Sequence, residues 1–241
     1  MNKDWENAEE NSRDILNKLK TRPVTNYSHI GTVYTALAFS YHIYQNYEKA
    51  EENYQSALKF YDPFKKSDQR RRSNALIGLA MVHQTNGKEG KASSLIQEAE
   101  ESIRLYNPEK YDSIGDILFF KAQILNHQGN RNEAISVYQE AISNYQREED
   151  PDELRQAAAL YLIADIYITE ERPDKAEPLL TKTKSIFKEK LGRRHKLTKK
   201  VNELLSAIES DMVSEYNAKN SREPTDLFTK DTMEVPAKIV Y

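Results

Sequence analysis

Four alanines stand at a constant 42-residue interval in this chain: Ala50, Ala92, Ala134 and Ala176. Self-similarity at a period of about 20 to 50 residues is typical of repeat arrays, in which each unit buries its apolar face against its neighbours. The interval therefore predicts a repeat architecture rather than one globular core. It also indicates that function lies in a binding surface rather than in an active site.

The same apolar frame surrounds each alanine. A large apolar residue comes 16 positions before it, a bulky residue four after it, and a small residue seven after it. In chain order these are Tyr34, Leu76, Leu118 and Leu160, then Tyr54, Ile96, Tyr138 and Leu180, then Ala57, Ala99, Ala141 and Thr183. Spacings of three, four and seven keep residues on one face of a helix. Each unit holds two such stripes around a short polar break such as Asn86-Gly87, so we predict an antiparallel helix pair per unit.

These residues resemble the tetratricopeptide repeat family, whose pattern matches Tyr34, Leu37-Ala38, Tyr41, Tyr47, Ala50, Tyr54 and Ala57. The 42-residue unit is similar to the repeats of kinesin light chain-like proteins and of bacterial peptide-sensing regulators. The stretch Lys190-Leu191-Gly192-Arg193-Arg194-His195 is similar to a junction of the kinesin light chain type. Over about residues 26–210, the resemblance implies an all-α, right-handed α-solenoid of about four helix pairs that binds protein partners.

Four segments follow from this interpretation: an N-terminal capping helix at 1–25, four repeats at 26–192, a C-terminal capping helix at 193–216, and a tail at 217–241. Pro23 is expected to end the first helix. Val201, Leu204, Leu205 and Ile208 are expected to cover the apolar end of the last repeat. The tail is interpreted as a flexible end, or as an extended segment that docks on a partner or in the chain's own groove.

Composition excludes several functional classes. The net charge of −3 predicts no bulk attraction to nucleic acid or to a membrane, and the absence of cysteine excludes disulfides, thiol catalysis and Cys-based zinc sites. No apolar run is long enough for a membrane span, and the first residues do not resemble a secretory signal. The expected location is therefore cytoplasmic.

Catalytic and metal-binding patterns are not found in the sequence. The five histidines fall in different units, and the chain has no HExxH pair, no Gly-rich phosphate loop and no nucleophile elbow. The acidic run at 148–153 precedes a helix, where it is a favourable charge block rather than a metal site. We expect no enzyme activity, no cofactor and no metal.

The resemblance implies that the first helix of each pair lines a concave groove, through the residues 1, 2, 5 and 8 positions after the Tyr34 position. A clamp for a C-terminal carboxylate would need Lys, Arg and Asn there, but the groove offers Thr35, Phe39, Gly78, Asp116 and Phe120. Binding of a chaperone C-terminus is therefore not expected. Peptide-sensing relatives use paired Asn, and only Asn74 and Asn126 lie nearby.

An apolar floor remains as the candidate partner-binding groove, and its residues are Phe39, Ile77, Met81, Phe119, Phe120, Tyr161 and Leu162. Its natural ligand is an amphipathic helix or apolar segment of a protein partner. The alternative is that packing between repeats, or the chain's own end helix, already buries these side chains. Replacing Phe119 and Phe120 with Ala should remove partner binding and preserve helicity if the groove hypothesis holds.

Basic residues form a second feature. Residues 182–200 carry nine Lys or Arg against Glu189 alone, and a smaller cluster comprises Lys65, Lys66, Arg70, Arg71 and Arg72. These charges are interpreted as a solvated face, as a surface for an acidic partner, or as a surface for RNA or anionic lipid. The candidate acidic-partner patch is Lys188, Lys190, Arg193, Arg194 and Lys196. Nucleic acid is not an expected partner, because binding of single strands uses aromatic rings for base stacking and Phe187 is the one aromatic residue within this stretch.

Two functions fit these observations. The first is a non-catalytic adaptor or assembly factor that binds an apolar or helical segment in its groove. The second is a constitutive structural subunit of a larger complex, with contacts made by the convex face and the C-terminal tail.

Overall fold

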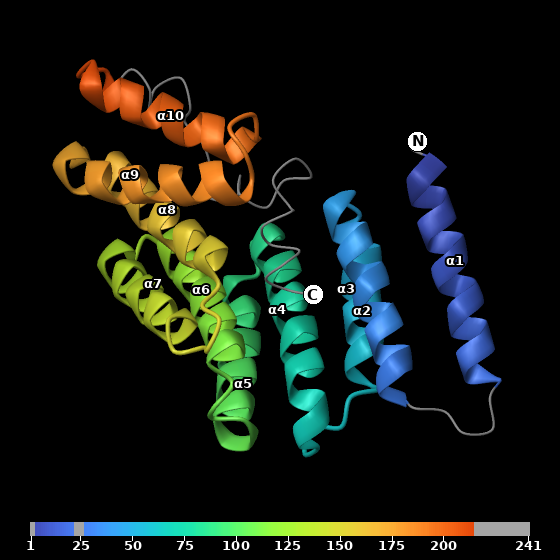
Figure 1. Cartoon of the computed structure of the whole chain (residues 1–241). Helices are drawn as coiled ribbons and strands as arrows, with labels where there is room; N and C mark the ends of the chain where they lie inside the picture. The colour runs from blue at the N-terminus through green and yellow to red at the C-terminus, as the bar shows by residue number, and fades with distance from the viewer. Residues whose placement is uncertain (1–2, 22–26, 215–241) are drawn as a thin grey trace. The chain divides into compact units, whose positions relative to one another are not determined.

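The computed structural model describes residues 3–21 and 27–214, and within them the regular structure is helical. The elements are α1 (Lys3–Lys20), α2 (Tyr27–Ile43), α3 (Tyr47–Leu58), the short 3-10 helix η1 (Lys66–Asp68), α4 (Gln69–Thr85), α5 (Glu89–Tyr106), α6 (Tyr111–His127), α7 (Arg131–Tyr145), α8 (Glu153–Thr169), α9 (Pro173–Lys190) and α10 (Lys196–Glu209) (Figure 1). Pro23 and the tail at 217–241 lie outside the described residues. Among the described helices, none combines the length and the apolar character that a bilayer span requires.

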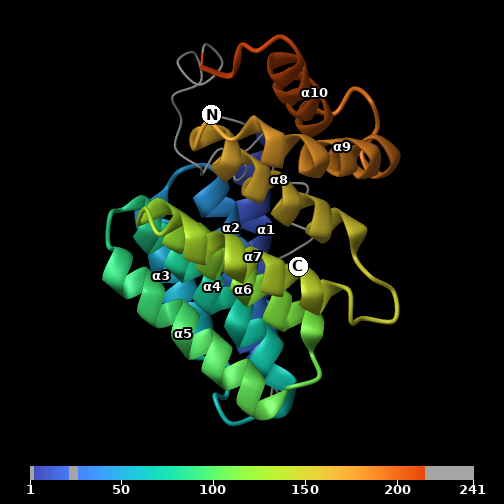
Figure 2. The ribbon, with the colours of Figure 1, turned by 90° about the vertical axis from the view of Figure 1, so that its left-hand side faces the viewer.

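The chain divides between Ser113 and Ile114 into two compact units. In the first unit, α2 packs on α3 and α4 packs on α5, while α1 contacts α2 and α3 contacts α4. In the second unit, α7 packs on α8, α8 on α9 and α9 on α10. Both views show α8, α9 and α10 side by side (Figures 1 and 2). These adjacent helix pairs confirm the predicted all-α class.

Burial follows the 42-residue period. The four alanines that define the period are fully buried, and so are the small residues seven positions after them, Thr183 included. The bulky residues four positions after them are buried as well, with Tyr54 and Leu180 at 0% exposure. The first and second helices of a pair therefore approach along small residues, and large residues fill the space beside that contact.

The turn inside each helix pair also repeats. Gln45, Gly87, Gly129 and Glu171 are equivalent in the 42-residue register, and their φ angles are 60°, 69°, 83° and 57°. In every one of these turns the following residue donates its backbone N–H to a carbonyl five residues earlier, as Lys88 does to His83 at 2.8 Å. This is the bond pattern that ends a helix with a left-handed residue. Two of the four turns use a residue with a side chain where glycine is the unstrained choice.

Tyrosines of second helices lie against glycines of first helices. A Cβ atom added to Gly78 would lie 2.3 Å from Cζ of Tyr54, and one added to Gly115 would lie 2.5 Å from Cε1 of Tyr145. Real Cβ atoms do not approach other heavy atoms this closely. The two glycines thus make room for the rings, and they belong to the packing between helices.

The terminal helices each pack on the helix next to them in the chain, α1 on α2 and α10 on α9. In α10 the predicted apolar residues Val201, Leu204 and Leu205 are buried, in a helix that packs on α9. In α1, Leu16 is buried, whereas Ile15, which corresponds to Ala57 in the 42-residue register, is 46% exposed. At this position α1 therefore departs from the burial pattern of the other second helices. Our view of α1 and α10 as caps stays an interpretation of these contacts.

Candidate functional site

The seven residues of the predicted groove differ in exposure. Phe39 on α2 and Met81 on α4 are half-buried. The other five are between 1% and 3% exposed: Ile77, Phe119, Phe120, Tyr161 and Leu162. The Phe119 ring makes edge contacts with Phe120 and with Tyr138 of α7, at centroid distances of 5.4 Å and 5.6 Å. The structure thus places most of the predicted floor inside the protein, as the alternative interpretation of the sequence described.

The register explains this difference. The position directly after Tyr34 and its equivalents holds Thr35, Ile77, Phe119 and Tyr161, and all four are buried. Thr35 Oγ1 lies 3.1 Å from the hydroxyl of Tyr61, which follows α3, and the Phe119 ring lies against Tyr138 of α7, so this position faces the second half of its own repeat. The position four residues later holds Phe39, Met81, Gln123 and Asp165, and three of these are half-buried. Only the second set keeps contact with solvent.

The buried polar residues of the second unit form an ion-pair network. Arg155 of α8 donates from Nη1 to both carboxylate oxygens of Asp116 on α6, each at 3.1 Å. The Tyr145 hydroxyl donates to the same carboxylate, and burial raises the pKa of Tyr145 well above its usual value. Asp152 caps α8 and lies 3.3 Å from Arg155 Nε. Asp116 and Arg155 are both buried, and together with Tyr145 they join α6, α7 and α8.

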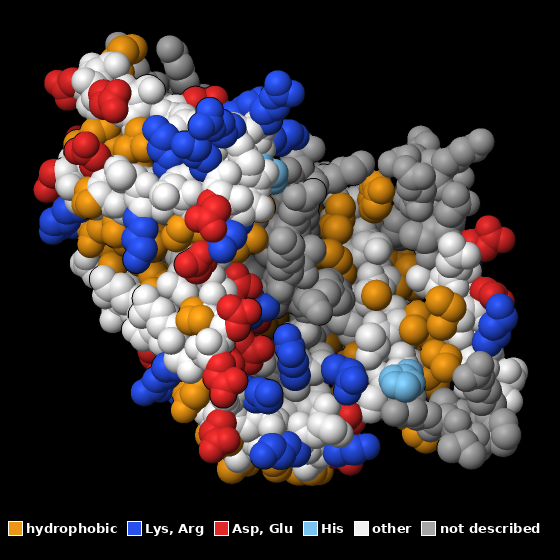
Figure 3. Space-filling model, viewed as in Figure 1, with side chains coloured by type: hydrophobic (Ala, Val, Ile, Leu, Met, Phe, Trp, Pro, Cys, Tyr) orange, Lys and Arg blue, Asp and Glu red, His pale blue; other side chains and the backbone are white. Residues whose placement is uncertain are grey.

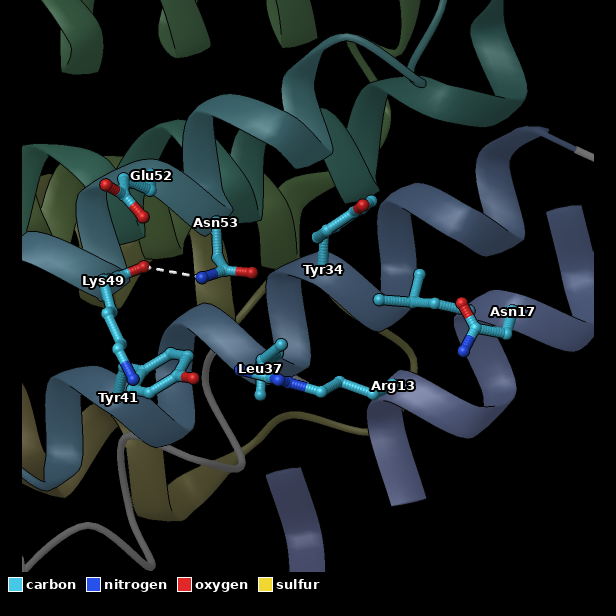
Figure 4. A pocket seen from close by; sticks show the side chains of 9 residues that line it. Arg13, Asn17, Tyr34, Leu37, Tyr41, Lys49, Glu52 and Asn53 are labelled. Atoms are coloured by element: carbon cyan, nitrogen blue, oxygen red, sulfur yellow. Dashed lines mark hydrogen bonds between the residues drawn. The ribbon is translucent and has the colours of Figure 1, made fainter. Parts of the chain in front are cut away.

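A cavity of about 450 Å³ lies between α1, α2 and α3 (Figure 4). Its lining residues are Arg13, Leu16, Asn17, Tyr34, Leu37, Tyr41, Lys49, Glu52 and Asn53. The cavity was not predicted. The repeat pattern gives no clear signal for it, since Ile15, the register equivalent of the buried Ala57, is exposed in α1.

The cavity's charges are largely compensated. Arg13 pairs with Glu9 at 2.5 Å, and Lys49 Nζ lies 5.1 Å from the centre of the Tyr41 ring. Burial, followed by a hydrogen bond with Glu9, raises the pKa of Tyr41 to about 12.

Two histidines, His42 and His83, have lowered pKa values. His42 is 8% exposed, and burial lowers its pKa to about 4. Burial also lowers the pKa of His83, whose Nδ1 lies 3.9 Å from Glu51. Among the described residues, no three His, Asp or Glu side chains are grouped so that they could hold a metal ion.

The candidate acidic-partner patch lies on both sides of the turn between α9 and α10. Lys188, Arg193, Arg194 and Lys196 are exposed, and Lys190 forms ion pairs with Glu153 and Glu189 at 2.9 Å and 3.2 Å. Figure 3 shows Lys and Arg side chains gathered over α9 and α10. The patch thus lies at the protein surface, whereas most of the predicted groove residues are buried.

Comparisons with known proteins agree with this architecture. A family model described as tetratricopeptide repeat matches residues 29–104 and 113–189, and no curated protein matches the chain. The crystal structure of BtubC (BKLC) from P. vanneervenii is similar with a TM-score of 0.64 and 19% identity, over 79% of this chain and 76% of that one. At this identity the likeness shows the fold alone. Since the family model covers more than half of the residues, the chain belongs to the tetratricopeptide repeat family.

Proposed function

We propose that the chain is a non-catalytic adaptor or assembly factor that binds an apolar or helical segment of a protein partner along its first helices. Membership of the tetratricopeptide repeat family supports protein–protein interaction in general. The proposal depends on one observation within the first unit. Phe39 and Met81 occupy equivalent positions on α2 and α4, two helices in contact, and both remain half-buried.

This pair suits a short apolar segment. An amphipathic helix contacts a groove through side chains spaced three or four residues apart, and each fully desolvated anchor contributes on the order of 2 kcal/mol. Phe39 also packs on the core of the first repeat, which restricts its rotamers before a partner arrives. The five buried residues of the predicted set, at 1% to 3% exposure, would then not contact the partner.

The test is affinity capture from native cell extract with mass spectrometry, using the full chain and a variant with Phe39→Gln and Met81→Gln. Glutamine keeps helix propensity while it removes the apolar surface. We expect the variant to lose the partner, since a loss of about 2 kcal/mol or more per anchor reduces affinity at least roughly thirtyfold. Circular dichroism of both proteins shows whether the helices remain. If Phe39→Gln lowers stability, the capture experiment is done with Met81→Gln alone.

A matched control comes from exposed apolar residues elsewhere in the same unit. Phe64 and Leu105 are 76% and 72% exposed, and they lie between or at the ends of helix pairs. Phe64→Gln with Leu105→Gln should retain the partner if the first helices bind it. Loss of the partner with this control, together with retention by the Phe39 and Met81 variant, would favour the second candidate, a constitutive subunit that makes its contacts elsewhere.

A further inference from the structure

We infer that the turn between α9 and α10 is a second contact surface, separate from the first helices, and that it binds an acidic segment of a protein partner. We call this surface the basic turn and define it as Lys188, Lys190, Arg193, Arg194 and Lys196. It does not depend on the proposed function, because it involves other residues in the other unit. Its charge, its exposure and its rigid support carry the inference.

Charge is strongly concentrated at this place. Of the chain's 35 Lys and Arg, nine fall within residues 182–200, against one of its 38 Asp and Glu. The rest of the chain is therefore net acidic, although the total charge is only −3. A concentrated positive surface attracts negatively charged groups and speeds their association.

Three cations of the basic turn are available to a partner. Lys188, Arg193 and Arg194 are exposed, and no carboxylate of the described residues lies within ion-pair distance of them. The other basic cluster differs on this point. Arg70 lies 3.5 Å from Asp112, Arg72 pairs with Glu98, and Arg71 donates to the backbone carbonyl of Ser67 at 3.2 Å. Those arginines serve contacts inside the first unit.

The backbone below the charges is firmly held. Gly192 adopts a φ of 91°, and its carbonyl accepts a 2.9 Å hydrogen bond from the buried hydroxyl of Thr198. The His195 side chain caps α10 by accepting from the N–H of Leu197. A partner therefore meets charges on a preformed turn, and little backbone entropy is lost on binding.

The surroundings favour an acidic protein segment over nucleic acid. Sequence-independent binding of single strands needs exposed aromatic rings for base stacking. Phe187 has 0% exposure and Tyr161 has 1%, so neither ring is available for stacking. Glu153 and Glu189 pair with Lys190, and these ion pairs interrupt the positive surface that the continuous charge of a nucleic acid or a lipid bilayer would need.

The inference is tested by fluorescence anisotropy with the full chain and a labelled peptide in which Glu and Ser alternate. A peptide of alternating Gln and Ser is the neutral probe. We expect binding of the acidic peptide only, and weaker binding as salt rises, because the contacts are exposed ion pairs. The variant with Arg193→Glu and Arg194→Glu should lose affinity at least about tenfold, since attraction becomes repulsion at two positions.

The matched control is Lys65→Glu with Lys66→Glu, which changes the total charge by the same amount at exposed residues of the other cluster. It should bind the acidic peptide as the unmodified chain does. Equal weakening in both variants would show a bulk charge effect and overturn the inference. Tighter binding of the unmodified chain to a uridine homopolymer or to phosphatidylserine vesicles than to the acidic peptide would also overturn it, as would no binding of that peptide.

Discussion

At the scale of single residues, exposure rather than residue type separates binding candidates from packing. Phe119 and Met81 both belong to the apolar set on the first helices, yet Phe119 is 1% exposed and Met81 is half-buried. Truncating a buried ring to Ala costs about 3–5 kcal/mol of unfolding free energy. Substituting Phe119 and Phe120 would thus damage folding before it tested binding, and half-buried positions give a cleaner experiment.

Titration of His42 provides a prediction at the same scale. Burial holds its pKa at about 4 in the folded chain, against 6.5 when unfolded, so the unfolded chain binds more protons between these values. We therefore expect stability to be complete above pH 6.5 and to fall as the pH drops towards 4. For one such group the loss is on the order of 3 kcal/mol.

Urea unfolding of the unmodified chain and of His42→Gln at pH 6.5 and pH 4 measures this effect. The variant is suitable because Gln84 fills the equivalent position of the next repeat, where it is 8% exposed. The variant should lose less stability than the unmodified chain over this range, while His83 and the carboxylates contribute equally to both. Identical losses of stability in the two proteins would mean that burial does not lower the pKa of His42 in the folded chain.

At the scale of elements, the sequence predicted the helix pairs better than their solvent-facing sides. The 42-residue interval and the apolar stripes located the pairs, because small residues such as Ala50 and Ala92 have to recur where two helices meet. The groove positions were harder, since a first helix touches several neighbours and buries a wider arc than one stripe indicates. The run from Ala157 to Ala164 is apolar on every side, which is itself a signal of complete burial for Tyr161 and Leu162.

The turn within each helix pair gives the prediction at this scale. Glu171 occupies a left-handed backbone conformation that Gly129 occupies in the preceding repeat, with φ angles of 57° and 83°. A residue with a Cβ atom is destabilised there by roughly 1–2 kcal/mol, and glycine's greater freedom in the unfolded chain offsets part of the gain from removing that atom. We expect Glu171→Gly to raise the free energy of unfolding by about 1 kcal/mol.

Thermal unfolding followed by circular dichroism measures this change, and Gly129→Ala is the reciprocal control. Gly129 has a positive φ, and a Cβ atom added to it would meet no atom within 4 Å. Any loss of stability in that variant therefore comes from backbone strain and not from a steric clash. The two substitutions should shift the melting temperature in opposite directions. A lower melting temperature for Glu171→Gly would show that the Glu side chain stabilises the turn by more than the strain costs.

At the scale of the whole molecule, contacts are local along the chain. The principal helix contacts join elements that follow one another or belong to adjacent repeats, such as α2 with α3 and α2 with α4. Stability in such arrays is close to a sum of unit and nearest-neighbour terms, so a defect in one repeat need not spread to distant ones.

The locality is tested by matched substitutions in the two units. Ile96 and Leu180 occupy the same position of their repeats and are 2% and 0% exposed. Replacing either one with Ala should cost about 2–5 kcal/mol, because each leaves a cavity in a buried contact. Hydrogen exchange with mass spectrometry should show lost protection in α4 and α5 for Ile96→Ala, and in α8, α9 and α10 for Leu180→Ala. If each variant instead lowered protection equally in all helices, the chain would unfold as one cooperative body, and the additive description of its repeats would have to be abandoned.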